Sequence, residues 1–270
     1  MQLLKLNEKA QRVGQEVARA GALLWEKGWA ESGAGNISLN MTDIFGGISM
    51  DFRKPPKIPL RRVYKKLAGH FIMVTKKGSR MRDLANNPAE NVCLVKVGRN
   101  GDEYQLLFED MDHLNEPSSE LATHLAIQEL FISEKKGQKA IVHTHPHELL
   151  SITHIPEFKN EEALNKLLWS MHTETVYFLP EGIGYVPYHL PGSEEIAKAT
   201  YKALKKHRVI LWEKHGCLAT GKDVAEAFDR IDLLAKSAHI YFICKNAGFT
   251  PEGLSDKQIQ EIRNSIGKIY

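Results

Sequence analysis

The sequence predicts a single domain over residues 1–270, of the α/β or α+β class. Strand-like and helical apolar patterns follow one another in mixed order, and no repeat or low-complexity segment interrupts them. The length of 270 residues, of which 43% are hydrophobic, is enough to bury one large core. A third observation concerns the segment 42–68, which is rich in glycine, proline and basic residues. No second core pattern begins after it, so we interpret it as a surface excursion and not as a domain linker.

The first part of the chain is expected to form a helix followed by short strands. Apolar residues within 3–27 recur at spacings of three and four, which is typical of an amphipathic helix, and Gly28 suits its end. The small residues at 32–36 predict a turn before a strand at 37–39. Further strands are predicted at 70–75, 91–97 and 103–108, the last two as a hairpin.

The rest of the chain alternates helices with strands. Ser118 begins a predicted helix that ends near residue 135, and Ser193 caps another that ends near residue 206. Ser255 and Gln258 form the signature of a capping box for a last helix. The other predicted helices are 161–171 and 222–247, and the other predicted strands are 140–145, 175–179, 184–188 and 209–212.

Charge and cysteine content exclude several functions. The formal net charge is +3, with acids and bases interspersed, whereas a nucleic-acid-binding protein needs a clustered basic face. No stretch reaches the roughly 18 apolar residues of a membrane span, and the N-terminus lacks the pattern of a secretory signal. The three cysteines have no CxxC spacing and suit free thiols, so we expect a cytoplasmic protein without nucleic-acid or membrane partners.

The most informative of the twelve histidines lie at the end of one apolar strand. Residues two apart on a strand point to the same face, so His143 and His145 present two imidazoles side by side. Pro146 interrupts the strand and removes His147 from that geometry. The best candidate for a third ligand is His215, which follows another short apolar strand. Three protein ligands with an open position are typical of catalytic zinc, although surface imidazoles or a hydrogen-bonded pair also fit the spacing.

Two turns offer groups for acid–base chemistry and anion binding. Glu120 stands at a predicted helix N-terminus, where it suits either a general base or a plain complement to the helix dipole. Ser118 and Ser119 add hydroxyl and backbone N–H groups that suit a phosphate. Gly35, before Asn36, lets the backbone approach a ligand closely. This turn matches neither a Walker A loop nor a dinucleotide-binding fingerprint.

In this order, the motifs resemble those of the class II aldolase/adducin-head family. The resemblance spans about residues 10–245 and rests on the stretches 25–29, 117–121, 169–174, 180–184 and 209–212. It implies a three-layer α/β/α domain around a largely antiparallel sheet. It also implies one zinc ion per subunit and a homotetramer with sites near subunit interfaces. The implied reaction is the reversible cleavage of L-rhamnulose 1-phosphate into dihydroxyacetone phosphate and L-lactaldehyde.

The resemblance also implies roles for individual residues. His143, His145 and His215 would be the zinc ligands, Glu120 the acid/base, and Glu174 a second carboxylate near the aldehyde half of the substrate. Phosphate or hydroxyl contacts would come from Gly35, Asn36, Gly78, Ser118 and Ser119. The chain departs from the aldolase pattern where Lys76 and Lys77 replace a small, serine-bearing turn and where Gly33 replaces a side-chain amide.

Other functions on the same scaffold are open from the sequence. They are cleavage of L-fuculose 1-phosphate, epimerisation of a pentulose phosphate and dehydration of a sugar phosphate. A binding head of the adducin type is a different class, which would lack the metal ligands that this chain retains. A Schiff-base aldolase would need a lysine in an apolar pocket, and no lysine here has such a pattern.

Overall fold

A mixed sheet forms the centre of the molecule in this computed structural model, which describes residues 7–46, 55–107, 116–135 and 137–266. Its strand order is β2-β5-β4-β3-β1-β6-β9-β8-β7, and every neighbouring pair is antiparallel except β7 and β8. The strands are β1 (Asn36–Asn40), β2 (Ile58–Pro59), β3 (Phe71–Thr75), β4 (Val92–Val97), β5 (Glu103–Leu107), β6 (Ala140–Thr144), β7 (Gly184–Val186), β8 (Val209–Trp212) and β9 (Gly216–Gly221). The expectation of a largely antiparallel central sheet is therefore confirmed.

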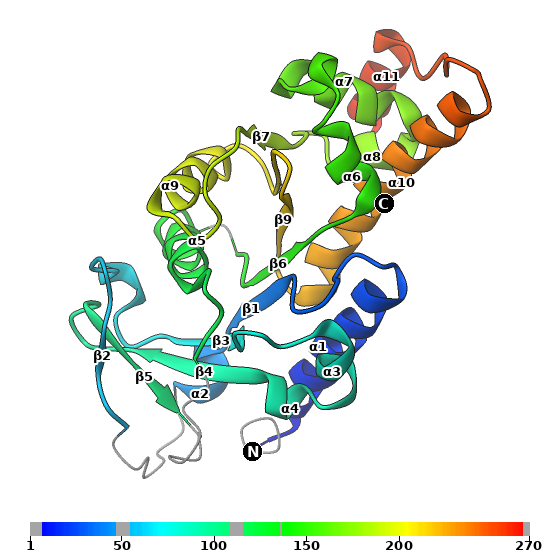
Figure 1. Cartoon of the computed structure of the whole chain (residues 1–270). Coiled ribbons are helices and arrows are strands. Elements are labelled where there is room, and N and C mark those ends of the chain that lie inside the picture. Colours follow the sequence, from blue (N-terminus) through cyan, green and yellow to red (C-terminus); the bar gives the residue numbers. More distant parts are fainter. Residues whose placement is uncertain (1–6, 47–54, 108–115, 136, 267–270) are drawn as a thin grey trace.

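Helices cover both faces of this sheet (Figure 1). One face packs on α1 (Glu8–Glu26), α3 (Met81–Asn86), α6 (His147–Ile152) and α10 (Val224–Asn246), and the other on α5 (Leu121–Ser133) and α9 (Glu194–Ala203). Both faces of the sheet are apolar, because successive side chains of a strand point to opposite faces. On β6, Val142 packs in the cluster of α1 and α10, and Ile141 packs in the cluster of α5 and α9. These layers agree with the expected three-layer α/β/α class.

The remaining elements lie at the ends of these layers. They are α2 (Thr42–Phe45), α4 (Pro88–Asn91), α7 (Glu161–Met171), α8 (Thr173–Phe178), α11 (Asp256–Ser265) and the 3-10 turns η2 (Lys65–Leu67) and η3 (Pro156–Phe158). Helices α7, α8 and α11 gather beside the C-terminal part of α10, away from β2 and β5 (Figure 1). No helix in the described ranges is long and apolar enough to cross a membrane.

Most predicted elements are confirmed, with ends shifted by a few residues. The hairpin of β4 and β5 forms, and Ser255 and Gln258 complete both hydrogen bonds of the capping box. The predicted first residues of α1 (3–6) and the predicted last residue of the hairpin (108) lie outside the described residues, as do 47–54 of the excursion. The described parts of the excursion place β2 at the sheet edge and bury Tyr64 and Leu67.

The predicted strand at 175–179 is wrong, because residues 175–178 belong to helix α8. Their β-branched and aromatic side chains favour a strand, but this preference is weak and tertiary contacts override it. Thr175 is buried, and its hydroxyl lies 2.7 Å from Ser237 Oγ on α10. The sequence prediction also missed several elements, among them α2, β2, α3, α4, α6 and β9.

Candidate metal centre

Three histidines meet at one end of the sheet because β6 pairs with β9. His143 lies on β6, His145 follows it directly, and His215 lies in the turn that joins β8 to β9. The backbone N–H of His145 donates to the carbonyl of Trp29 (2.8 Å), which fixes the end of β6 against the chain after α1. A Cβ on Gly216 would lie 2.5 Å from His145 Cδ2, so only glycine allows the turn to approach this closely.

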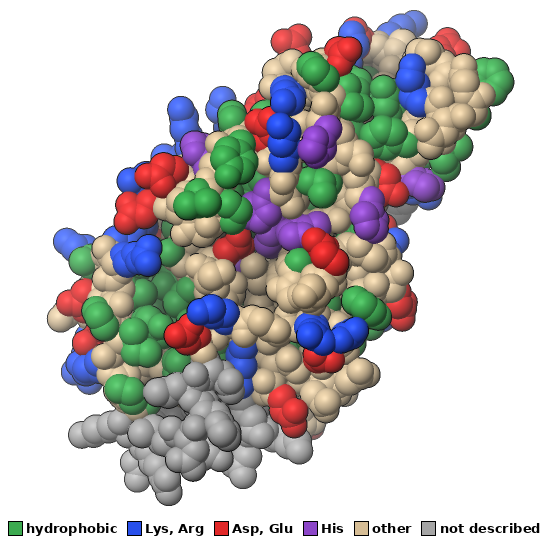
Figure 2. All heavy atoms as spheres, in the orientation of Figure 1, with side chains coloured by type: hydrophobic (Ala, Val, Ile, Leu, Met, Phe, Trp, Pro, Cys, Tyr) green, Lys and Arg blue, Asp and Glu red, His purple; other side chains and the backbone are tan. Residues whose placement is uncertain are grey.

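The candidate ligand atoms of His143, His145 and His215 all lie within 4.8 Å of one another. Their ring centroids are 4.9 to 5.6 Å apart. Figure 2 shows histidine side chains gathered near the middle of this face, with acidic side chains beside them. Within the described ranges, these three residues are the one such group of histidine, cysteine or acidic side chains. The predicted triad is therefore close enough to hold one ion.

The hydrogen bonds of the rings leave nitrogen lone pairs facing one another. His143 Nδ1 donates to the carbonyl of Cys217 (2.8 Å), and His145 Nδ1 donates to Glu31 Oε1 (3.0 Å). In the neutral rings, both Nε2 atoms are then unprotonated, yet they lie 3.3 Å apart. Two nitrogens that bind one tetrahedral zinc ion lie about 3.4 Å apart, so this pair fits a shared cation.

The remaining nitrogens of the cluster agree with metal binding. His215 Nδ1 is buried and has no hydrogen-bond partner among the described residues, so this ring retains binding capacity. Burial, with the neighbouring His145, lowers the pKa of His143 to about 3, and burial with His143 lowers the pKa of His215 to about 4. Both rings are neutral near pH 7, which is the form that binds metal. The donor set fits a divalent metal.

Glu120 lies beside the histidines at the N-terminal end of α5. Its Oε2 is 3.9 Å from His143 Nε2 and its Oε1 is 3.8 Å from His215 Nε2. The side chain is almost fully buried, and Asn36 Nδ2 donates to Oε2 at 2.9 Å. A carboxylate held at this separation can exchange protons with a ligand bound at the cluster.

Three turns converge next to this carboxylate. The turn that contains Gly33 and Gly35 lies against the turn that contains Gly78, since a Cβ added to Gly33 would be 3.6 Å from Gly78 Cα. Within the first turn, Gly35 adopts a positive φ of 78°. The third turn contains Ser118 and Ser119, and an antiparallel β-bridge between Lys76 and Pro117 joins it to the second turn. The segments that carry the expected phosphate contacts thus lie together at one edge. The expected contacts are Gly35, Asn36, Gly78, Ser118 and Ser119.

The two serines of the third turn differ in their environment. Ser118 is buried, and its hydroxyl accepts from the backbone N–H of Glu120 (3.3 Å), whereas Ser119 is exposed. Lys77 extends to Glu116, with Nζ 2.7 Å from Oε2 in an exposed ion pair. The exposed groups therefore sit at the rim of the turns, and the buried hydroxyl supports the start of α5.

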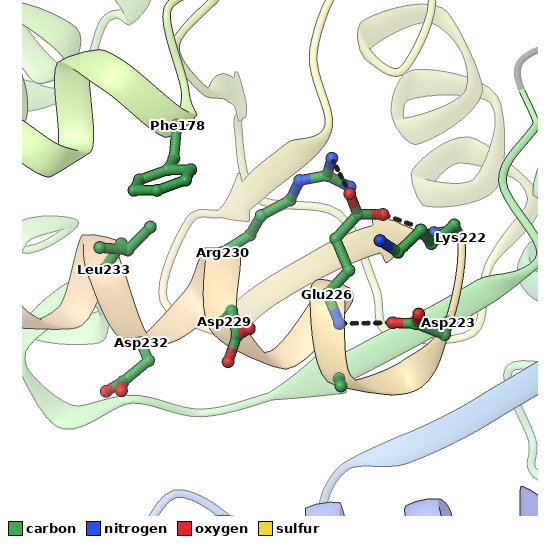
Figure 3. A pocket seen from close by; sticks show the side chains of 9 residues that line it. Phe178, Lys222, Asp223, Glu226, Asp229, Arg230, Asp232 and Leu233 are labelled. Carbon is green, nitrogen blue, oxygen red and sulfur yellow. Dashed lines mark hydrogen bonds and ion pairs between the residues drawn. The ribbon is translucent and has the colours of Figure 1, made fainter. Parts of the chain in front are cut away.

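Glu174 is not joined to this cluster by any hydrogen bond or ion pair in the described part of the chain. It lies on α8, where it accepts from Thr173 and pairs with His172 Nε2 at 2.8 Å. A groove of about 580 Å³ lies between α8 and α10 (Figure 3). Phe178 and Leu233 line one part of the groove, and the ion pair of Arg230 with Glu226 lines another.

The sequence interpretation missed three residues that support the site. Glu31 orients His145, whereas Ser38 and His124 form hydrogen bonds next to Asn36. From the sequence alone, His124 is interpreted as a structural residue on a helix face. Its position four residues after Glu120 places both on one side of α5, and this spacing is the signal that could have found it.

The fold and this site together define a class of protein, in which a three-layer domain can hold a divalent metal beside a buried carboxylate. The chain belongs to the class II aldolase and adducin N-terminal domain family, whose sequence model matches residues 15–242. The resemblance noted in the sequence is therefore confirmed, and the aldolases of this family depend on a metal.

Individual relatives narrow the comparison. The chain is similar to a rhamnulose-1-phosphate aldolase of Bacteroides thetaiotaomicron, with 39% identity over 92% of this chain and 91% of the relative. A protein of the same name from Listeria monocytogenes is 30% identical over 94% of this chain and 92% of the relative. Among solved structures, a sugar-phosphate aldolase from Thermotoga maritima has a TM-score of 0.74 and 32% identity, covering 90% of this chain and 99% of that one.

Proposed function

We propose that this chain is a zinc-dependent aldolase that reversibly cleaves L-rhamnulose 1-phosphate into dihydroxyacetone phosphate and L-lactaldehyde. The observation that carries the proposal is the position of Glu120, 3.8–3.9 Å from two of three imidazoles that can share a metal. Two relatives named rhamnulose-1-phosphate aldolase, matched along nearly their whole length, support the substrate.

His143, His145 and His215 would hold the zinc ion. When bound there, zinc supplies Lewis-acid stabilisation of the negative charge that develops on the ketose oxygens as the carbon–carbon bond breaks. Residues around the three histidines hold the rings of His143 and His215 in place. The carbonyl of Cys217 holds His143, and the indole of Trp212 packs 4.6 Å from His143 and 4.9 Å from His215 between ring centroids.

Glu120 is proposed as the acid/base. In the cleavage direction, the fragment that becomes dihydroxyacetone phosphate must gain a proton at the carbon that lost its bond, and in the synthesis direction dihydroxyacetone phosphate must lose the same proton. Asn36 holds Oε2, which leaves Oε1 as the oxygen free to carry that proton. The phosphate would bind to Gly35, Gly78, Ser119 and the backbone around them. Asn36 and Ser118 would support Glu120 and contact the edge of the phosphate.

We propose that Glu174 serves the aldehyde half of the substrate from a neighbouring subunit. Its side chain is 52% exposed, and no hydrogen bond or ion pair within the described residues joins it to the three histidines of its own chain. This arrangement suits the homotetramer with interface sites that the family resemblance implies. We propose one catalytic domain over residues 1–270, with 42–68 as a surface excursion, that works in the cytoplasm, where Cys217 and Cys244 remain thiols.

A coupled assay for dihydroxyacetone phosphate tests this proposal. Release from L-rhamnulose 1-phosphate should be rapid, should disappear with a chelator and should return with zinc. The same assay with L-fuculose 1-phosphate, and epimerase and dehydratase assays with pentulose phosphates, separate the alternatives on this scaffold. A metal-free protein inactive on the whole panel would contradict the proposal and favour a binding head.

A further inference from the structure

We propose that His124 is a positioning residue that orients Glu120 through the side-chain amide of Asn36. The inference rests on the proposed function, since it concerns the acid/base of that reaction. His124 lies on α5, one turn after Glu120, and is fully buried. Its Nδ1 lies 2.7 Å from Ser38 Oγ, and its Nε2 contacts Asn36 Oδ1.

The carboxylate at one end of this network, together with a neutral imidazole, fixes the direction of every hydrogen bond in it. The Glu120 carboxylate can only accept, so Asn36 must present its Nδ2 to Oε2 and its Oδ1 to the imidazole. His124 must then donate from Nε2, which leaves Nδ1 to accept from the Ser38 hydroxyl. Burial lowers the pKa of His124 to about 4, which agrees with this neutral tautomer. The donors run from Ser38 through His124 and Asn36 to Glu120.

The imidazole decides which way the Asn36 amide faces. Asn36 and Ser38 are adjacent on one face of β1, and both are buried together with Glu120. Without a donor at Oδ1, the amide can rotate and turn its oxygen towards the carboxylate, which repels it. With His124 in place, only the donating orientation satisfies all buried groups. Glu120 is therefore held with one oxygen engaged and the other facing His215.

A matched pair of amide variants tests this role. In a side chain that replaces histidine, the amide of glutamine takes the place of Nε2, whereas that of asparagine takes the place of Nδ1. His124→Gln can still donate to Asn36, but His124→Asn can only retain the contact with Ser38. We expect His124→Asn to lower kcat about 100-fold with KM little changed, and His124→Gln to stay within about 5-fold of the parent. His239→Asn, on the exposed side of α10 next to Glu148, controls for the substitution itself.

Two measurements that do not depend on turnover complete the test. All variants should bind the same amount of zinc per chain, and a crystal structure of zinc-loaded His124→Asn should show the Asn36 amide rotated or Glu120 displaced. Parent-like kcat in His124→Asn, equal losses in both variants or loss of zinc would overturn the inference. If the parent protein is itself inactive on the ketose phosphates, the proposed function fails, and the position of Glu120 in the crystal structure still decides the role of His124.

Discussion

The two carboxylates proposed for proton transfer lie in opposite environments. Glu120, at the end of α5, is 7% exposed and is held by Asn36 between two imidazoles. Glu174, on α8, is half exposed, and its hydrogen bond and ion pair join it only to its sequence neighbours Thr173 and His172 among the described residues. Helix α8 borders the groove shown in Figure 3. The residues of the first region hold one another within a single chain. The carboxylate of the second region is exposed, and we propose that it meets the site of a neighbouring subunit.

The largest expected effect comes from removing a proposed metal ligand. His143→Ala removes a buried imidazole that the Cys217 carbonyl and the Trp212 indole hold in place. We expect zinc binding to be lost and activity to fall by more than about 1,000-fold, since several kcal/mol of charge stabilisation disappear. Metal analysis and the coupled assay measure both. His147→Ala, an exposed neighbour outside the triad, is the control and should keep its zinc.

Glu120→Gln tests the carboxylate without removing the metal ligands. We expect kcat to fall about 100- to 10,000-fold, the usual contribution of a general acid or base, while zinc remains bound. Glu116→Gln, an exposed acid four residues earlier, should have little effect. Near-normal turnover of Glu120→Gln with zinc bound would remove Glu120 from the mechanism.

Glu174→Gln tests whether the exposed region completes the site of another subunit. We expect kcat to fall about 10- to 100-fold, because a second proton-transfer group is lost while the metal and Glu120 remain. Co-expression with Glu120→Gln should restore part of the activity, because assemblies that mix the two chains would pair an intact Glu120 with an intact Glu174. Purified assemblies that carry both variants and regain no activity would show that the two groups do not act across an interface.

The smallest effect is expected at the rim of the converging turns. Lys77 forms an exposed ion pair with Glu116, and such pairs contribute little to stability because water and salt screen them. Lys77→Ala should therefore leave the melting temperature nearly unchanged and alter kcat/KM by less than about 5-fold. A rise in KM beyond about 10-fold that also grows at low salt would instead assign Lys77 to the phosphate.

Local patterns predict the histidines of the site, since they lie at the ends of two short apolar strands. The spacing of His143 and His145 fixes their common face, and the turn before β9 brings His215 to the same edge. The residues of α8 favour a strand in their own local pattern, which does not contain the contact of Thr175 with Ser237, 62 residues away. For His124, the spacing from Glu120 indicates that both lie on one side of α5, but its role also depends on Asn36 and Ser38, which lie on a strand more than 80 residues earlier.

One residue of β9 connects the metal site to the interior of the domain. The carbonyl of Cys217 accepts from His143, whereas its thiol is fully buried in the cluster under α1 and α10, where burial raises its pKa. Because this sulfur lies under the helices, a thiol reagent can reach it only when the packing of α1 and α10 on the sheet opens. The rate at which Cys217 is labelled would therefore measure how often that packing opens directly behind the proposed metal site.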